Sequence, residues 1–218
     1  MTDTKIFELG GTHPTIYHPF VSALLPDLKK KTIVDMGCGR GVWGFLIRTQ
    51  RDLTKSTFIG VDYNAFYLKF VNHHKIYDKT VRADITKKLP FKDASVDFLI
   101  CSEVIEHLTK KQGESLLKEI DRIMKPGSRA IVTTPNVWLN MPYNNPLDRH
   151  YSLWNKDDFS KRGYMVRGIG AKLPFNKTTW YTPLIHAAYY FMTPFSYVFP
   201  QLSGLLVSVK DYSVRSYE

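Results

Sequence analysis

The chain has few cysteines and no long hydrophobic run. Its 218 residues include only two cysteines, Cys38 and Cys101, which cannot build the disulfide framework of a small secreted protein. Residues Met1–Leu9 hold no apolar run of signal-peptide length, and no stretch reaches the roughly 18 uninterrupted apolar residues of a membrane-spanning helix. We therefore expect a protein with reduced thiols that works in the cytoplasm.

The sequence also has no internal repeats and no low-complexity tracts, and it has fewer acidic than basic residues. With 44% hydrophobic and 23% charged residues, the chain has the composition of a globular protein with a sizeable core. Lys and Arg exceed Asp and Glu by 30 − 20 = 10. Between Arg149 and Lys210, eight basic residues are opposed only by Asp157 and Asp158. This basic half is compatible with nucleic acid, an anionic membrane surface or an acidic substrate, and also with solubility alone.

Short apolar runs alternate with segments of helical period, a pattern typical of an α/β domain with a mostly parallel sheet. The predicted strands are Thr32–Met36, Thr57–Val61, Thr80–Arg82, Val96–Cys101, Ala130–Thr134, Tyr164–Gly168 and Leu205–Lys210. The predicted helices run from about Val42 to Thr49, from Ala65 to His74, along Leu116–Met124 and from Asp157 to Arg162.

A turn dense in glycine follows the first predicted strand. It contains Gly37, Gly39 and Gly41, and it leads directly into a predicted helix. Glycine lets the backbone turn sharply and lets a ligand approach without meeting a Cβ atom, while the helix N-terminus offers free N–H groups. The G-x-G-x-G spacing differs from the dinucleotide pattern G-x-G-x-x-G, and no P-loop lysine follows.

Three carboxylates accompany this turn. Asp35 stands two positions before the first glycine, where it would repel a pyrophosphate and suit an ammonium group. Asp62 ends the second strand, where an acidic residue can accept two ribose hydroxyls. Asp84 follows the third strand, where it can accept from the exocyclic amine of a purine. An adenosine that carries an amino acid and no phosphate fits this set, and S-adenosylmethionine is that compound.

With these residues, Leu89–Phe91 and Cys101–Leu108, the chain resembles the class I S-adenosylmethionine-dependent methyltransferases between about Thr32 and Thr134. It is most similar to their ubiquinone-biosynthesis-like, small-molecule branch. The resemblance implies an α/β fold with a Rossmann-like seven-stranded sheet, mostly parallel with an antiparallel last strand, and helices on both faces. It also implies one domain over residues 1–218, with an N-terminal helical cap (1–30), a cofactor-binding core (31–135) and an acceptor-side region (136–218).

The resemblance further implies roles for individual residues. It assigns the methionine part of the cofactor to Asp35, Gly37, Gly39 and Gly41, the ribose to Asp62, and the adenine to Tyr63, Asp84 and Ile85. Ser102 would face the cofactor from the end of the fourth strand. A side chain of the N-terminal segment often lies near the methionine carboxylate in this family, and His13, Tyr17 and His18 remain open for that role.

The predicted reaction is an in-line methyl transfer that releases S-adenosylhomocysteine. The methyl group is already activated by the sulfonium, so positioning supplies most of the acceleration, and a hydroxyl acceptor also needs a base. His107 and His150 are the candidate bases, and His150 lies in a polar loop beyond the carboxyl edge of the sheet. The leading interpretation is transfer to oxygen of a small-molecule, glycan or lipid-linked acceptor, without a metal. Nucleic acid is a less favoured acceptor, and the oligomeric state is open.

Two alternatives within the same fold remain. Glu103, Glu106, His107 and His150 also match the pattern of metal-dependent RNA 2′-O-methyltransferases, although no RNA-binding module or arginine-rich stretch is present. The other alternative is a protein that binds S-adenosylmethionine without turnover. A nicotinamide oxidoreductase is a third class, which fails if S-adenosylhomocysteine and not NAD raises the melting temperature.

The aromatic segment Thr182–Pro200 stands apart from these motifs. Pro183, Pro194 and Pro200 predict that it is not one long helix. Three interpretations are open: a helix packed on the sheet edge, an aromatic wall over an apolar acceptor, and a patch that rests on a membrane surface.

Overall fold

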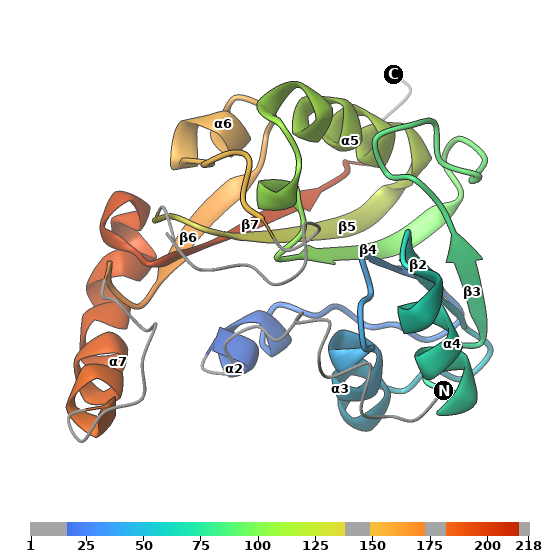
Figure 1. Cartoon of the computed structure of the whole chain (residues 1–218), viewed down its shortest axis with the longest axis horizontal. Coiled ribbons are helices and arrows are strands. Elements are labelled where there is room, and N and C mark those ends of the chain that lie inside the picture. Colours follow the sequence, from blue (N-terminus) through green and yellow to red (C-terminus); the bar gives the residue numbers. More distant parts are fainter. Residues whose placement is uncertain (1–16, 138–148, 173–181, 214–218) are drawn as a thin grey trace.

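A single seven-stranded sheet organises the part of the chain that the structure describes, which is residues 17–137, 149–172 and 182–213 of a computed structural model (Figure 1). The strand order is β3-β2-β1-β4-β5-β7-β6. Strands β1 to β5 pair in parallel, and β7 runs antiparallel to both of its neighbours. The expected Rossmann-like α/β sheet with an antiparallel last strand is confirmed.

The element bounds agree with the predicted alternation of strands and helices. The strands are β1 (Thr32–Met36), β2 (Thr57–Asp62), β3 (Lys79–Arg82), β4 (Val96–Ser102), β5 (Met124–Pro135), β6 (Met165–Ile169) and β7 (Leu205–Asp211). The helices are α2 (His18–Ser22), α3 (Val42–Gln50), α4 (Ala65–His73), η2 (Ile105–His107), α5 (Lys110–Ile123), α6 (Lys156–Ser160), α7 (Thr182–Val198) and η4 (Pro200–Leu202). Strand β5 starts earlier than predicted, because the chain turns directly from α5 into pairing with β4. The division of the chain at residues 30 and 135 stays a prediction.

Helices cover both faces of the sheet, with α5 and α6 on one face and α2, α3 and α4 on the other (Figure 1). The alternation of side chains along β1 divides the core accordingly. Val34 and Met36 pack on the side of α5, whereas Ile33 packs with the α3 and α4 side chains. Helix α5 begins with a capping box between Thr109 and Gln112, and its apolar face is buried against the sheet.

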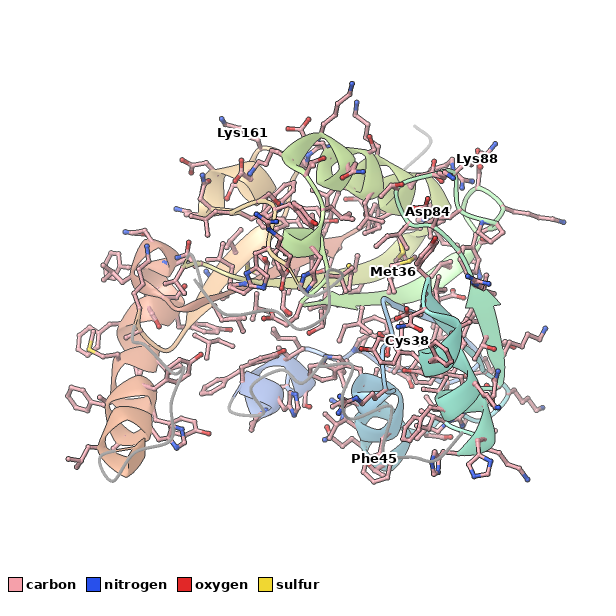
Figure 2. All side chains as sticks on the ribbon, viewed as in Figure 1. Met36, Cys38, Phe45, Asp84, Lys88 and Lys161 are labelled. Atoms are coloured by element: carbon pink, nitrogen blue, oxygen red, sulfur yellow. The ribbon has the colours of Figure 1, made fainter. Side chains whose placement is uncertain are left out.

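The winding of the sheet reverses between β1 and β4. The chain builds β2 and β3 on one side of β1, then returns to place β4 and β5 on the other side. Ligands of open α/β sheets bind at such a reversal, beyond the carboxyl ends of the strands. Met36 ends β1 at this point, and Cys38 lies in the turn that follows it (Figure 2).

The prediction that prolines divide the aromatic segment Thr182–Pro200 is wrong, because most of the segment forms one helix, α7. The helix runs unbroken over 17 residues and carries Pro194 inside it. Pro183 lies in the first turn, where a missing N–H removes no helical hydrogen bond, and Pro200 lies beyond the end of the helix. Only Pro194 removes a bond, and the packing of α7 on β6 holds the helix together across it. In the described ranges, no helix has both the length and the apolar character needed to cross a membrane.

Candidate active site

The glycine turn after β1 is held against the end of β2. The backbone N–H groups of Gly37 and Cys38 both donate to the Val61 carbonyl, at 2.8 and 2.9 Å. Gly37, Gly39 and Gly41 all have positive φ, which side chains other than hydrogen make costly. A Cβ atom at Gly37 would lie 2.4 Å from Val104 Cγ2, whereas one at Gly39 would meet no atom of the described residues within 4 Å. Gly37 is therefore required by packing, and Gly39 opens on free space.

Asp62 lies directly beside that space. Its Oδ2 accepts from the Gly39 N–H at 2.9 Å, and its Oδ1 accepts from the Asn64 N–H at 2.8 Å. Burial raises the pKa of the carboxyl, and the backbone N–H groups oppose this rise. Each carboxylate oxygen has a second lone pair, so both can accept from neighbouring ligand hydroxyls. The half-buried carboxylate and the open glycine backbone fit a ribose with an attached amino acid.

The residues predicted to contact the adenine lie at the ends of β2 and β3. Tyr63 is exposed, and the guanidinium of Arg82 lies 5.7 Å from the centroid of its ring. Asp84 comes two residues after Arg82, the register partner of Asp62. The Asp84 Oδ1 accepts hydrogen bonds from the Thr86 hydroxyl and from the Thr86 backbone N–H. Both bonds lower the pKa of Asp84, and the bond from the hydroxyl has the larger effect. Ile85 is partly buried against the core on the α5 side.

Asp35 has a different environment from the one predicted for it. The carboxyl is almost fully buried, and the Tyr77 hydroxyl donates to its Oδ2 at 2.5 Å. Burial raises the pKa of Asp35 to about 7, and the hydrogen bond from Tyr77 opposes this rise. Asp35 therefore lies beneath the turn in contact with Tyr77, and its contact with a ligand ammonium stays a prediction.

Tyr77→Phe is expected to destabilise the protein more at pH 8 than at pH 5. Asp35 ionises near 3.8 when unfolded and near 7 when folded, so its contribution to stability falls as pH rises between these values. Above pH 7 the Tyr77 hydroxyl stabilises a buried carboxylate, and its loss should lower the free energy of unfolding by about 1.5–3 kcal/mol. Urea unfolding at both pH values measures this, with the exposed Tyr151→Phe as control. An equal loss at both pH values would contradict the assignment.

The end of β4 meets the N-terminal segment. Ser102 Oγ lies 2.8 Å from Thr133 Oγ1 and 3.4 Å from the Tyr17 hydroxyl. Tyr17, one of the three residues left open for this segment, thus lies beside Ser102, and its place near the cofactor stays a prediction. The His18 ring packs edge-on against Trp43, with centroids 5.1 Å apart, and His13 lies outside the described residues.

Two glutamates follow Ser102 on the acceptor side. Glu103 has a φ of 55°, uncommon outside glycine, and its Oε1 accepts from Thr133 Oγ1 at 3.1 Å. Glu106 is buried, and its Oε2 accepts from Thr134 Oγ1 at 3.0 Å. Its Oε1 is buried without a hydrogen-bond partner among the described residues. Burial raises the pKa of both carboxyls, that of Glu103 to about 8, and the charge of Glu103 raises the pKa of Glu106 further.

The two predicted histidines converge on Glu106. One carboxylate oxygen of Glu106 and one ring nitrogen each of His107 and His150 all lie within 4.8 Å of one another. The centroids of the two imidazole rings are 5.0 Å apart. The Tyr151 N–H donates to the Glu106 carbonyl at 2.8 Å, so the loop is anchored beside η2. His107 Nδ1 lies 3.2 Å from the Arg149 carbonyl, and an Nδ1 proton donated there puts the lone pair of the neutral ring on Nε2. Burial, and after it the charge of His107, lower the pKa of His150 to about 4.

Sequence reasoning missed two residues of this region. Tyr77 gave no local signal, because its contact with Asp35 spans 42 positions of the chain. Thr133 could have been found, since a polar pair with Thr134 ends an apolar strand beside β4. Helix α7 contributes Tyr189, which is buried. Burial raises the pKa of the Tyr189 hydroxyl, and the charge of Glu103 raises it further.

Comparisons with known proteins agree with this geometry. Residues 34–132 match a family described as a methyltransferase domain. A protein of Mycolicibacterium smegmatis named a probable S-adenosylmethionine-dependent methyltransferase is 32% identical over 107 residues, which are 49% of this chain and 38% of the relative. The mitochondrial ubiquinone biosynthesis O-methyltransferase of Mus musculus is 28% identical over 111 residues, 48% of this chain and 28% of the enzyme. The chain spans less than half the length of these curated relatives.

Solved structures share the fold over nearly the whole chain. A chain of the Haloferax volcanii complex between a methyltransferase and the Trm112 methyltransferase activator superposes with a TM-score of 0.67 at 20% identity, covering 97% of this chain and 95% of that one. An S-adenosylmethionine-dependent methyltransferase of Archaeoglobus fulgidus gives 0.59 at 20% identity, covering 96% and 100%. At this identity the likeness establishes the fold alone.

The sheet order is that of the Rossmann-like methyltransferase fold, and the part of the chain that matches the methyltransferase-domain family, residues 34–132, contains the glycine turn and Asp62. Over this part, the chain is similar to S-adenosylmethionine-dependent methyltransferases, the superfamily that its sequence resembles, and S-adenosylmethionine is the cofactor of that class.

Proposed function

We propose that this chain methylates an oxygen of a small-molecule, glycan or lipid-linked acceptor. The observation that carries the proposal is the open space at Gly39 beside the Asp62 carboxylate, at the carboxyl edge of the sheet. Asp62 would hold the ribose, the Gly37–Gly41 backbone the methionine part, and Tyr63, Asp84 and Ile85 the adenine. The bound cofactor supplies a methyl group activated by positive sulfur.

The residues of this chain would position the acceptor and receive its proton. The cofactor would supply the methyl group to an acceptor oxygen placed in line with the sulfur, and the sulfur would keep the electron pair of the broken carbon–sulfur bond. The hydroxyl proton then passes to a basic nitrogen, for which His107 and His150 are the candidates. Ser102 and Tyr17 would border the cofactor from the end of β4, where their hydroxyls lie 3.4 Å apart.

A labelled-methyl assay across phenolic, glycan, lipid and RNA acceptors tests this proposal, combined with calorimetry of S-adenosylhomocysteine binding. We expect binding of S-adenosylhomocysteine and a labelled product with at least one hydroxyl acceptor. Binding with no product from any acceptor would favour the alternative of a non-catalytic S-adenosylmethionine-binding protein. No binding would reject the proposed site itself.

A second candidate function is methylation assisted by a divalent cation, with the RNA 2′-hydroxyl as one acceptor. One carboxylate and two imidazoles suit such an ion, and the unpartnered Oε1 of buried Glu106 favours it. Glu103, the fourth residue of the predicted set, lies outside the convergent group and contacts Thr133 instead. A bound cation would compensate the buried carboxylate and lower the pKa of a coordinated acceptor oxygen.

His150→Ala is expected to weaken Mn²⁺ binding about tenfold or more, because one of three protein ligands is lost. Electron paramagnetic resonance of free Mn²⁺ measures this without reference to activity. The control is His73→Ala, which removes an imidazole at the end of α4, outside the convergent group. Equal Mn²⁺ affinity for the wild type and His150→Ala would reject the cation site and leave the metal-free proposal intact.

A further inference from the structure

Helix α7 has its polar and apolar faces reversed relative to a surface helix. Its buried positions include Thr193 and Ser196, both with small polar side chains, together with Tyr189. Its exposed positions carry large apolar side chains: Phe191 is 73% exposed and Val198 is 64% exposed. A surface helix of a globular protein normally buries its apolar stripe and exposes its polar one.

The exposed apolar residues form one continuous stripe. They follow the helical spacing along α7 and continue into η4, and they are Leu184, Phe191, Phe195, Val198, Phe199 and Leu202, here called the outer face. Figure 1 shows α7 beyond the β6 edge of the sheet, on the outside of the fold. Contiguous exposed patches of this kind mark interaction sites.

The buried side of α7, which holds Tyr189, Thr193 and Ser196, packs closely against β6. This packing keeps the outer face turned toward solvent. A Cβ atom at Gly168 would lie 2.4 Å from the Ser196 carbonyl, and one at Gly170 would overlap the Tyr189 ring. The Gly170 N–H also donates to Thr193 Oγ1 at 3.1 Å. Rotating α7 to bury its phenylalanines would break these contacts, because only glycine allows the helix to approach β6 this closely.

The charge distribution indicates what covers the outer face. No Asp, Glu, Lys or Arg occurs between Lys177 and Lys210, so the outer face offers no ionic group to a protein partner. Two cations lie on the β6 side of α7. The Arg167 guanidinium of β6 is 5.2 Å from the ring centroid of Tyr197 in α7, and Lys172 is exposed three residues after the end of β6. The whole chain carries a net charge of +10. An uncharged aromatic surface bordered by cations matches the boundary between acyl chains and anionic headgroups.

We propose that the outer face of α7 docks the protein on an anionic lipid bilayer. The phenylalanines would enter the boundary between headgroups and acyl chains, while Arg167 and Lys172 contact lipid phosphates. This inference goes beyond the proposed methyl transfer, and vesicle binding tests it whether or not an acceptor is found.

Co-sedimentation of the full chain with vesicles provides the test. We expect binding to vesicles of equal parts phosphatidylcholine and phosphatidylglycerol, weaker binding to pure phosphatidylcholine, and a decrease with added salt. The double variant Phe191→Ser/Phe195→Ser should lower the partition coefficient about tenfold or more, because two apolar side chains no longer leave water. Its fold is checked by circular dichroism, and both altered side chains point outward.

The matched control is Phe45→Ser/Phe66→Ser, which removes two phenylalanines that are exposed on α3 and α4. Phe45 lies at the lower edge of the view, below α3 and apart from α7 (Figure 2), and this variant should bind vesicles like the wild type. An equal loss in both double variants would overturn the proposal, as would no vesicle binding by the wild type. So would a wild-type dimer, seen by analytical ultracentrifugation, that the α7 variant converts to a monomer without any change in vesicle binding.

Discussion

Asp62→Ala is expected to weaken the binding of S-adenosylhomocysteine by about 1–3 kcal/mol, which corresponds to roughly 5- to 150-fold in the dissociation constant. The carboxylate has one lone pair on each oxygen beyond its bonds to the Gly39 and Asn64 N–H groups. Truncation removes the acceptor for the ribose hydroxyls and also the anchor that keeps Gly39 in place. Isothermal titration calorimetry measures the affinity.

Glu114→Ala is the control for this prediction, because it removes an exposed carboxylate of α5 and should leave the affinity unchanged. Asp62→Asn keeps one oxygen acceptor and should fall between the wild type and Asp62→Ala. Unchanged affinity in Asp62→Ala, with a lowered melting temperature, would mean that Asp62 only fastens the glycine turn.

The sequence predicted those features of the fold that depend on residues close together in the chain. Apolar runs located every strand of the sheet, and the spacing of Gly37, Gly39 and Gly41 located the turn, because each depends on neighbouring residues. Asp62 was identified in the same way, since a carboxylate at the end of the second strand lies beside the turn after the first.

What could not be predicted depends on contacts between distant positions. Asp35 follows Ile33 on the α3 side of β1, but its partner Tyr77 has no motif to mark it. Similarly, His150 reaches Glu106 only because the Tyr151 N–H bonds to the Glu106 carbonyl across the fold. The spacing of histidines along the chain carries no information about that contact.

Proline was misleading for α7 for a related reason. Local reasoning counts the hydrogen bond that Pro194 removes, but the glycines that let the helix dock, one in β6 and one just after it, lie more than twenty positions earlier. The close fit at Gly168 and Gly170 stabilises a helix that the sequence of the segment alone argues against. The same fit leaves Phe191 and Phe195 exposed, which agrees with the interpretation of the segment as a surface patch, one of the three that the sequence left open.

Gly37→Ala and Gly39→Ala should separate stability from binding within one turn. A methyl group at Gly37 would lie 2.4 Å from Val104 Cγ2, at a φ of 74°, and valine has few rotamers with which to yield. We expect a loss of about 2–5 kcal/mol in the free energy of unfolding, as the sum of overpacking and left-handed backbone strain. Urea denaturation measures it.

At Gly39 the added methyl group meets no atom within 4 Å in the part of the chain that the structure describes, so only the backbone strain at a φ of 47°, about 1–2 kcal/mol, should appear in stability. Its cost should appear in binding, because the methyl group projects into the space beside Asp62 that the nucleoside would fill. We expect the affinity for S-adenosylhomocysteine to fall about tenfold or more, because the added methyl group would overlap the bound ligand and not a protein side chain. A Gly39→Ala protein that binds with wild-type affinity would show that the ligand lies elsewhere, even if Gly37→Ala unfolds as expected.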